Sequence, residues 1–256
     1  MSDKSYWQGK RCWLIGASTG IGAACAAALN AQGARLALTA RNPAKLADLA
    51  AKLGNDNTLV CPADVTTPEE LHKAYTDIRE QWGGLDVLLF LAGTYQAARS
   101  WELNPDQARQ AISTNYLGAV DAVHTVLADW LAAGQGQIVL TSSVAGLRGL
   151  PQSLYYGPSK AALTHFAEVL HLDLEAKGIK VQVIHPGFVA TPLTAHNDFP
   201  MPNLISPEQA ATEILAGMES SAFEIHFPRA FTRKLKFLRC LPYRWYFSLI
   251  HRFTGL

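Results

Sequence analysis

The sequence predicts an α/β protein in which helices cover both faces of a doubly wound parallel sheet of about seven strands. Apolar runs of strand length alternate with segments of helix length, which is the order that a parallel sheet requires. The runs are apolar throughout, as in strands that are buried on both faces. A chain of 256 residues with 49% hydrophobic residues can fill one such core.

The individual elements follow from local composition. Strands are expected at Cys12–Ile15, Leu36–Thr39, Thr58–Cys61, Val87–Leu91, Gln137–Thr141, Lys180–His185 and Phe223–Phe227. Helices are expected at Ala23–Ala31, Pro43–Leu53, Pro68–Trp82, Pro105–Ala132 and Ser159–Lys177. Ser206 and Gln209 have the spacing of a capping box, which predicts a further helix start. No linker rich in Pro, Gly or Ser divides the chain.

A glycine-rich turn follows the first predicted strand. Gly16, Gly20 and Gly22 separate the apolar run Trp13–Ile15 from an Ala-rich stretch that favours a helix. Glycines permit a tight turn and a close backbone approach, so a pyrophosphate can sit on free N–H groups at the positive end of the helix. An ordinary strand-to-helix turn is the alternative, but three glycines at these spacings favour nucleotide binding.

Tyr156 and Lys160 place a phenol and an ammonium four positions apart. On a helix, a rotation of ~100° per residue puts both on one face, where the cation would lower the phenol pKa from ~10. The same rotation places Tyr155 roughly 140° from Lys160. Most such pairs are ordinary exposed residues, so the weight of this one as an acid–base pair comes from its surroundings.

Further short motifs accompany the turn and the pair: Asp64-Val65, Asn115 with Gly118, Ser143 thirteen residues before Tyr156, and Pro186-Gly187 with Thr191. Together they make the chain resemble the short-chain dehydrogenase/reductase family from about Arg11 to Phe227. The resemblance implies a Rossmann-like fold and a nicotinamide cofactor. It also implies hydride transfer between that cofactor and a carbonyl or alcohol. We therefore expect residues 1–228 to form a dinucleotide-binding and catalytic domain, followed by a tail at 229–256.

The resemblance also implies a role for individual residues. The catalytic residues that it implies are Asn115, Ser143, Tyr156 and Lys160. The cofactor-binding residues that it implies are Gly16, Ser18, Thr19, Gly20, Ile21, Gly22, Asp64, Val65, Ala92, Gly93, Tyr156, Lys160, Pro186, Gly187, Val189 and Thr191. Tyr156 would exchange a proton with the substrate oxygen while Ser143 donates a hydrogen bond to it. Lys160 would keep the phenol acidic and hold the nicotinamide ribose, and Asn115 would hold a water. Since neighbouring strand residues point to opposite faces, only one of Ser142 and Ser143 should reach the site, and the offset favours Ser143.

One element departs from the family pattern. Where the family commonly has Asn-Asn-Ala-Gly, this chain has Phe90-Leu91-Ala92-Gly93. Two amides that usually tie strand ends together are missing, which bears on local stability or on the position of the cofactor. No group that transfers protons is lost.

The end of the second predicted strand bears on the choice of cofactor. NAD-dependent enzymes of this fold usually place a carboxylate there to bind the ribose 2′-hydroxyl. This chain has Ala40 and then Arg41, which can bind the 2′-phosphate of NADP through charge-assisted bonds. A solvated arginine at a strand end is the alternative. The missing acid favours NADP(H) over NAD(H).

The segment Leu193–Ile205 lacks helical or strand periodicity, and it lies where the family carries its substrate lid. Its apolar residues include Phe199, Met201 and Leu204, beside His196. They favour a hydrophobic ketone, aldehyde or alcohol as substrate, although they could equally pack the loop against the protein.

Composition narrows the function classes and the partners. A net charge of +1 argues against nucleic-acid binding, and no apolar stretch has the length of a signal peptide or a spanning helix. The four cysteines form no C-x-x-C pair, which favours a reducing cytoplasm, and the eight histidines show no metal-ligand spacing. We expect a cytoplasmic homo-oligomer without a metal.

The C-terminal tail is strongly basic. From Arg229 onward it holds seven of the 22 Lys and Arg residues and none of the 21 acidic residues. Apolar residues recur at helical spacing on both sides of Pro242, which predicts two amphipathic helices. Such helices could lie on an anionic membrane, cover the substrate cleft or contact a partner subunit.

The sequence therefore predicts an NADP-dependent oxidoreductase that acts mainly as a carbonyl reductase on an apolar substrate. A sensing or scaffold protein that binds NADP(H) without turnover is the alternative from another class. The four reactive side chains speak against it, and the altered Phe90-Leu91 element speaks slightly for it. A lyase or epimerase is a further alternative, less favoured because such relatives usually have a larger C-terminal domain.

Overall fold

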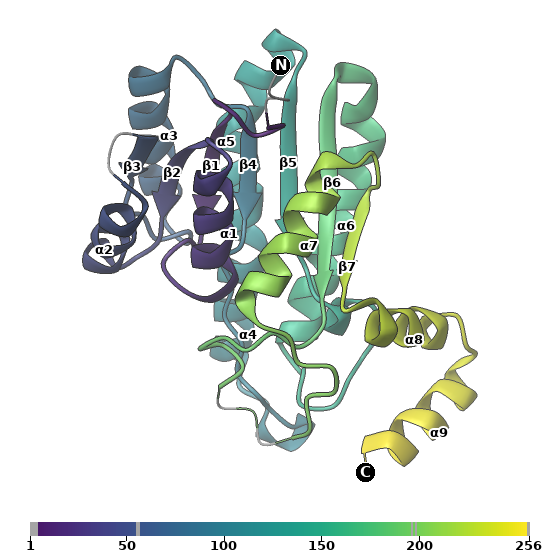
Figure 1. Cartoon of the computed structure of the whole chain (residues 1–256). Coiled ribbons are helices and arrows are strands. Elements are labelled where there is room, and N and C mark those ends of the chain that lie inside the picture. The colour runs from purple at the N-terminus through teal and green to yellow at the C-terminus, as the bar shows by residue number, and fades with distance from the viewer. Residues whose placement is uncertain (1–4, 55–56, 196, 198, 255–256) are drawn as a thin grey trace.

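A computed structural model describes residues 5–54, 57–195, 197 and 199–254. Seven parallel strands form one sheet in the order β3-β2-β1-β4-β5-β6-β7 (Figure 1). The strands are β1 (Arg11–Ile15), β2 (Arg35–Thr39), β3 (Thr58–Val60), β4 (Val87–Phe90), β5 (Gly136–Thr141), β6 (Ile179–Pro186) and β7 (Glu224–Phe227). The predicted fold class is confirmed, and each strand lies within one residue of its expected bounds. Strand order reverses between β1 and β4, and ligands of such sheets bind outside the carboxyl ends of the strands at that point.

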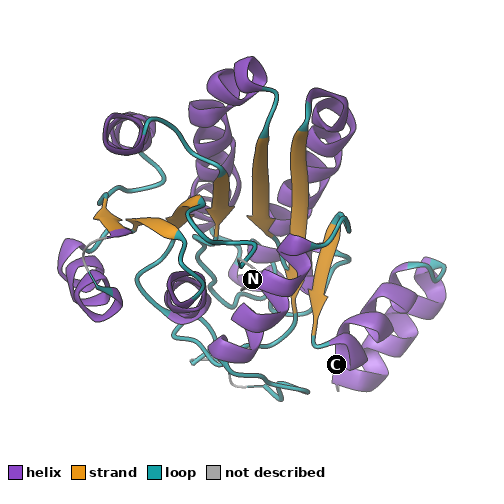
Figure 2. Cartoon of the chain, turned by 45° about the horizontal axis from the view of Figure 1, so that its top comes forward, coloured by secondary structure: helices purple, strands orange, loops and turns teal. Residues whose placement is uncertain are grey.

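Helices cover both faces of the sheet, as Figure 2 shows. One face carries α3 (Pro68–Trp82), α5 (Gly118–Ala133) and α6 (Tyr156–Leu174), and the other carries α1 (Gly20–Ala31), α2 (Pro43–Leu53) and α7 (Pro207–Glu219). Trp13 belongs to the buried cluster on the first face, and its neighbour Leu14 to the cluster on the second. The alternation of side chains along doubly buried strands therefore builds two apolar cores.

Local signals explain where several helices begin and end. α2 and α3 start at prolines, and the Asn42 side chain accepts a hydrogen bond from the N–H of Lys45 at 3.1 Å. Gly83, with a φ of 71°, ends α3 in the left-handed conformation. The predicted capping box is present, because Ser206 and Gln209 each bond the other's backbone N–H.

Three predicted helices have different bounds. The helix expected from Ala23 begins at Gly20. The continuous helix expected at Pro105–Ala132 is wrong: α4 (Pro105–Ile112) is followed by a π-helical turn (Ser113–Leu117) before α5 begins. The wider turn accommodates a side chain that binds backbone outside the helix, as described below. The helix expected from Ser159 begins at Tyr156 and gives way to a 3₁₀ turn at Glu175–Lys177.

The C-terminal segment forms two helices, α8 (Arg229–Arg239) and α9 (Tyr243–Thr254), which we call the C-terminal hairpin. The predicted break at Pro242 separates them. The hairpin projects beyond the edge of the sheet at which the strands end (Figure 1). Within the described ranges, no helix is both long and apolar enough to cross a membrane.

α8 is anchored to β7 by two polar contacts. The buried Thr232 hydroxyl bonds Nδ1 of His226 at 2.7 Å, and Lys236 forms an ion pair with Glu224. The first half of the hairpin is therefore part of the packed structure, although every strand lies before Pro228.

Candidate active site

Side chains from three parts of the chain meet at the carboxyl edge of the sheet. Ser143 follows β5, Tyr156 and Lys160 stand on the first two turns of α6, and Asn115 comes from the π-helical turn. A Cβ atom on Gly93, which follows β4, would lie 3.4 Å from both the Asn115 Oδ1 atom and the Lys160 Nζ atom. The four residues that the sequence predicted as catalytic are thus brought to one place.

Asn115 explains why the helix is interrupted. Its side chain is fully buried, accepts from the N–H of Thr94 at 2.7 Å and donates to the Thr94 carbonyl at 3.0 Å. It also donates to the Ser159 hydroxyl at 2.9 Å. These bonds tie the π-helical turn to the segment after β4 and to α6, so the wide turn is fixed by tertiary contacts.

Ser142 and Ser143 point to opposite sides, as the strand geometry predicted. The Ser142 hydroxyl is buried between α6 groups: it donates to the Lys160 carbonyl at 2.8 Å and lies 2.7 Å from the Thr164 hydroxyl. The Ser143 hydroxyl instead accepts from the N–H of Ala145 at 3.1 Å and faces the Tyr156 phenol. Only Ser143 can reach a group bound beside Tyr156.

Tyr156 is partly buried, and its pKa differs from the sequence prediction. Burial raises the pKa to about 12, and the hydrogen bond from Ser143 only partly opposes that rise. The Lys160 ammonium lies 5.7 Å from the centre of the Tyr156 ring. The predicted lowering of the phenol pKa by Lys160 is therefore wrong for this structure, because burial raises that pKa.

Lys160 is itself buried, and its Nζ atom donates to the Thr141 carbonyl at 2.7 Å. Burial lowers the pKa of its ammonium to about 7. Near neutral pH the amine is thus poised between its charged and neutral forms, which explains why it does little to acidify Tyr156.

Tyr155 and Tyr95 complete the surroundings of Tyr156. The Tyr155 hydroxyl accepts from the N–H of Asn104 and donates to the Glu102 carbonyl, so it fixes the segment before α4. The Tyr95 ring stands edge-on to the Tyr156 ring at 5.2 Å. Sequence reasoning missed Tyr95, although an aromatic residue two positions after Gly93 was a usable signal for a wall of the site.

The turn between β1 and α1 fits a pyrophosphate. A Cβ atom on Gly16 would lie 2.5 Å from the backbone nitrogen of Ala92, and one on Gly22 would lie 2.1 Å from the Gly16 carbonyl oxygen. Gly20 has a φ of 55°. In the described structure the Thr19 side chain makes no capping bond, and the first turn of α1 holds no acidic residue. The N–H groups at the positive end of α1 are thus left to bind an anion.

The adenine end of the predicted cofactor site lies beyond β2 and β3. Arg41 is exposed, and its charge, together with hydrogen bonds from Thr66, lowers the pKa of Asp64 against the effect of burial. Oδ1 of Asp64 already accepts from the Thr66 N–H at 2.9 Å. Val65 lies against Gly118, where a Cβ atom would come 2.8 Å from the Val65 carbonyl oxygen. The arrangement leaves the Arg41 side chain exposed to solvent, two residues after the end of β2.

The altered Phe90-Leu91 element is held by packing and backbone bonds. Phe90 is fully buried in the core beneath α3, α5 and α6, and the N–H of Leu91 donates to the Ile15 carbonyl at 2.7 Å. Two buried hydrogen bonds join β1, β2 and the end of β3. The Trp13 indole donates to the Thr39 hydroxyl at 2.8 Å, and that hydroxyl donates to the Cys61 carbonyl at 2.8 Å. The strand ends beside Ala92 are therefore tied together without the two amides.

The loop after β6 borders the other side of the site. Pro186 ends β6, and a Cβ atom on Gly187 would come 2.9 Å from the Phe231 ring of α8. Val189 pairs with Ile205, and the Thr191 methyl group lies beside Gly20. The two ends of the predicted lid therefore lie close together, near the glycine-rich turn between β1 and α1.

Part of the lid is packed against the protein. The Phe199 ring lies 5.9 Å from the Phe188 ring, and Asn197 donates to the Met201 sulfur at 3.3 Å. Leu204 is exposed. His196, which the sequence placed in this lid, lies outside the described residues.

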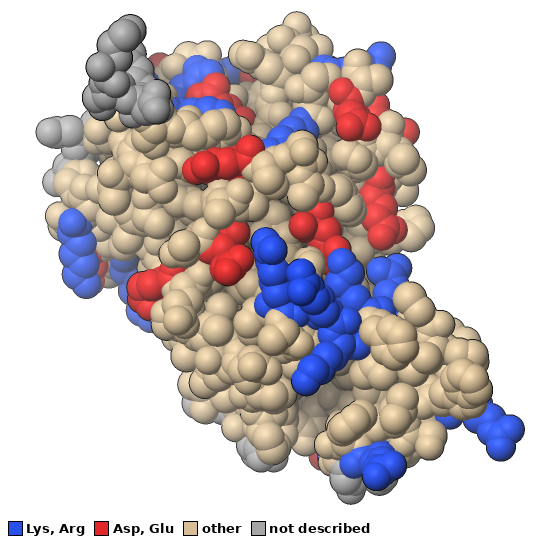
Figure 3. Space-filling model, turned by 45° about the vertical axis from the view of Figure 1, so that its right-hand side comes forward, with Lys and Arg blue, Asp and Glu red and all other residues tan. Residues whose placement is uncertain are grey.

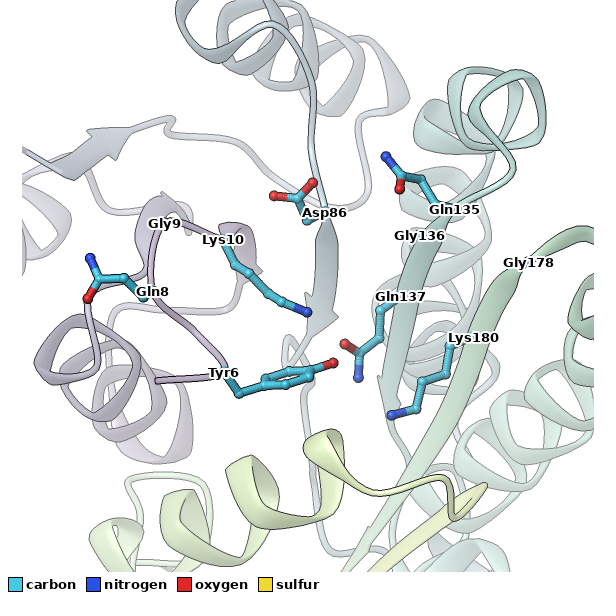
Figure 4. A pocket seen from close by; sticks show the side chains of 10 residues that line it. All are labelled: Tyr6, Gln8, Gly9, Lys10, Asp86, Gln135, Gly136, Gln137, Gly178 and Lys180. Atoms are coloured by element: carbon cyan, nitrogen blue, oxygen red, sulfur yellow. The ribbon is translucent and has the colours of Figure 1, made fainter. Parts of the chain in front are cut away.

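A cavity of about 470 Å³ opens at the opposite, amino edge of the sheet (Figure 4). Its two lysines already have protein partners. The Lys10 ammonium lies 3.7 Å from the centre of the Tyr6 ring, and Lys180 donates to the carbonyls of Met218 at 2.6 Å and Ser220 at 2.5 Å. None of the predicted site residues lines this cavity, so the catalytic candidates lie elsewhere.

Other reactive side chains add no second centre. Cys12, Cys25 and Cys61 are buried, and burial raises the thiol pKa of all three. Cys240 is exposed on the hairpin. Across the part of the chain that the structure describes, no three His, Cys, Asp or Glu side chains come together as metal ligands.

Comparison with known proteins identifies the family of the chain. A family model described as short chain dehydrogenase matches residues 10–199. An uncharacterized oxidoreductase of Myxococcus xanthus is 32% identical over 244 residues, which cover 94% of this chain and 95% of that protein. One of Staphylococcus haemolyticus is 29% identical over 214 residues, 84% of this chain and 93% of that protein.

A solved structure shows the same fold. The crystal structure of a short-chain dehydrogenase from Streptomyces avermitilis superposes with a TM-score of 0.79 at 24% identity, covering 90% of this chain and 92% of that chain. The family model spans most of the chain, and the relative from Myxococcus xanthus matches it nearly end to end. The chain therefore belongs to the short-chain dehydrogenase family and is an oxidoreductase that uses a nicotinamide cofactor.

Proposed function

We propose that the protein is an NADP(H)-dependent carbonyl reductase for an apolar substrate, with Tyr156 as the proton donor. The observation that carries the proposal is the convergence of four side chains on one spot. Ser143 faces the Tyr156 phenol, and Asn115 and Lys160 lie equally close to Gly93. Among the residues that the structure describes, no other group combines a proton donor, a second hydroxyl and a buried amine beside a glycine-rich anion site.

The protonation states favour reduction of a carbonyl. With a pKa of about 12, the Tyr156 phenol holds its proton at neutral pH and can donate it to a carbonyl oxygen. Ser143 would donate a hydrogen bond to the same oxygen. Lys160, with a pKa of about 7, can take up a proton and pass it toward Tyr156 or hold the ribose. The cofactor, when bound, supplies the hydride.

The N–H groups at the start of α1 and the residues predicted around them would hold the cofactor. The turn fits the pyrophosphate because its glycines leave no room for a side chain. Asp64, Val65 and Arg41 would border the adenosine, and Gly93 and Gly187 the nicotinamide. The alternative is a protein that binds NADP(H) without turnover, for which the altered Phe90-Leu91 element is the one supporting feature.

A substrate screen tests the proposal directly. We expect purified protein to oxidise NADPH in the presence of some aliphatic or aromatic ketones or aldehydes, with larger apolar substrates favoured. The screen should also include acyl thioesters as substrates. Tight NADPH binding without oxidation by any of these compounds would instead support the sensing or scaffold alternative.

Arg41 should make NADPH bind more tightly than NADH. One charge-assisted contact with the 2′-phosphate contributes ~1.5–3 kcal/mol, or roughly ten- to a hundred-fold in affinity. We expect Arg41→Ala to erase most of this difference in calorimetric titrations and to leave NADH binding unchanged. Lys52→Ala, which removes an exposed cation at the far end of α2, should keep it. Equal or tighter binding of NADH to the unmodified protein would overturn the preference for NADP(H).

We propose that the protein is cytoplasmic and forms a homo-oligomer. Apolar side chains on the outer surface support the subunit contact. Leu117, at the end of the π-helical turn, and Val169 and Leu172 on α6 are exposed. Contiguous exposed apolar side chains commonly mark subunit contacts.

We also propose that the C-terminal hairpin binds an anionic membrane surface. Trp245 and Phe253 on α9 are 62% and 74% exposed. In Figure 3, Lys and Arg side chains gather where the hairpin meets the body of the molecule, next to acidic side chains of the body. Exposed aromatic rings on a segment that holds basic and no acidic residues suit the boundary between lipid headgroups and acyl chains.

Vesicle co-sedimentation tests this surface. Since each basic group near an anionic membrane adds ~1 kcal/mol, we expect binding to anionic vesicles at low salt and release at high salt. The double variant Trp245→Ser/Phe253→Ser should lose most of the binding. Trp101→Ser, which alters an exposed tryptophan outside the hairpin, should leave the binding unchanged. Absence of binding at low salt would leave cleft cover or subunit contact as the role of the hairpin.

A further inference from the structure

Arg148 joins the C-terminal hairpin to the loop that leads from Ser143 to Tyr156. Its Nη1 atom donates to three carbonyls where α8 ends: Leu238 at 3.1 Å, Arg239 at 3.2 Å and Leu241 at 2.6 Å. The last carbonyls of a helix lack partners within it and carry partial negative charge. No glycine closes α8, so a guanidinium from a distant part of the chain caps it.

The same guanidinium holds α9. It lies 4.1 Å from the centre of the Tyr246 ring and 4.5 Å from the centre of the Tyr243 ring. Tyr246 is only 2% exposed, and its hydroxyl donates to the Gly149 carbonyl at 2.7 Å. A planar cation can bond carbonyls at its edge while its face rests on aromatic rings, which an ammonium cannot do.

The contacts between Arg148 and the hairpin form although both carry positive charge. The hairpin carries seven basic residues and no acidic one, and Arg148 adds a further positive charge. Among the described residues, no carboxylate pairs with Arg148. The carbonyl and ring contacts of Arg148 therefore add to the polar contacts that anchor α8 to β7, and their loss should release α9.

The loop that carries Arg148 is packed against catalytic candidates. The Gly146 N–H donates to the Ser143 carbonyl at 2.9 Å, and a Cβ atom on Gly146 would lie 2.7 Å from the Lys160 carbonyl carbon. The loop therefore has little freedom beside α6. A hairpin fixed to Arg148 is fixed relative to Ser143.

The other side of the hairpin meets the lid. Phe231 of α8 lies 5.4 Å from the Phe188 ring, which in turn lies 5.9 Å from Phe199 of the lid. The hairpin thus spans the two loops that flank the site, and Figure 1 shows it projecting on the side where the strands end.

We propose that Arg148 is a positioning residue that clamps the hairpin to the loop behind Ser143, so that the hairpin forms an apolar wall of the substrate site. The wall would contact the part of a long substrate that extends away from the carbonyl. This role rests on the proposed reductase function, whereas the clamp itself is a structural property that can be measured without turnover.

The test compares Arg148→Ala and Arg148→Lys with Arg252→Ala, which removes an exposed cation from the same hairpin. In Arg148→Ala, we expect amide hydrogen exchange in residues 240–254, which depend on Arg148 for their attachment, to become at least about ten-fold faster, with partial recovery in Arg148→Lys. The value of kcat/KM for a long apolar ketone should fall roughly ten-fold or more, mostly through KM, while that for a short ketone stays within about two-fold. NADPH affinity should not change, and Arg252→Ala should match the unmodified protein in each measurement.

Two results would overturn the proposal. Unchanged hairpin exchange in Arg148→Ala would show that Arg148 is not the clamp. An equal fall in kcat/KM for long and short ketones would show that the residue stabilises the fold without shaping the substrate site. If the unmodified protein reduced no ketone, the reductase proposal and the wall would both fail, and the exchange data would still decide the clamp.

Discussion

Tyr156→Phe should remove turnover while leaving NADPH affinity nearly intact. The substitution deletes the hydroxyl that faces Ser143 and keeps the ring that packs against Tyr95. A positioned acid contributes ~10²–10⁴-fold to the rate, so kcat should fall by at least that order. Steady-state assays and calorimetric titration of NADPH separate the loss of chemistry from any loss of binding.

Tyr155→Phe is the matched control. It deletes a neighbouring phenol whose hydroxyl is already bonded to the backbone of Asn104 and Glu102. We expect a mild loss of stability and a small change in kcat. A larger loss of turnover in Tyr155→Phe than in Tyr156→Phe would refute the assignment of the proton donor.

Glu224→Gln should destabilise the protein by about 3 kcal/mol at neutral pH. Glu224 accepts from His185 at 2.8 Å and pairs with Lys236, and these bonds, acting against burial, lower its pKa to about 2. A carboxylate whose folded-state pKa is lowered stabilises the fold above its unfolded pKa, and that stabilisation is lost as pH falls through the folded value. The difference between variant and unmodified protein should therefore shrink between about pH 4.5 and pH 2.

Urea unfolding at neutral and acidic pH measures this difference. Glu213→Gln removes an exposed carboxylate from α7 and should change the free energy of unfolding little. A Glu224→Gln effect that stays constant down to about pH 2 would show that the loss comes from packing and not from the carboxylate charge.

The contacts of Glu224 explain why this effect should be large. A series of hydrogen bonds links α8 to α6. Glu224 bonds both Lys236 on α8 and His185 in β6. His185 lies 3.0 Å from the Thr164 hydroxyl, which lies 2.7 Å from the Ser142 hydroxyl. Ser142 donates to the Lys160 carbonyl. Removal of the Glu224 charge therefore weakens its bonds to the buried His185 in β6 and to Lys236 on α8, which costs more than the loss of a surface pair.

Local sequence signals were sufficient for most of the fold. The bounds of α2 and α3 were predicted because a proline marks each start and a glycine follows each end. The strands were predicted because doubly buried strands are apolar along their whole length. The break between α4 and α5 was not predicted, because it depends on bonds between Asn115 and Thr94 that form only in the folded chain.

The candidate site shows the same limit. The thirteen-residue offset and strand geometry distinguished Ser143 from Ser142, and helical rotation distinguished Tyr156 from Tyr155. The pKa of Tyr156 could not be predicted from spacing, because its direction depends on how deeply the ring and Lys160 are buried. Arg148 carried no signal at all, since its partners lie about ninety residues further along the chain.

The hairpin projects beyond the edge of the sheet at which the strands end (Figure 1), where the residues around Tyr156 follow β4 and β5. The polar cavity of Lys10 and Lys180 lies at the opposite edge (Figure 4). A molecule held to a lipid layer by α9 would thus be oriented with its catalytic edge toward that layer. An apolar ketone dissolved in the layer would then reach Tyr156 by lateral diffusion in two dimensions. Its supply would depend on its concentration in the lipid and not on its solubility in water, while NADPH would still arrive from the aqueous side.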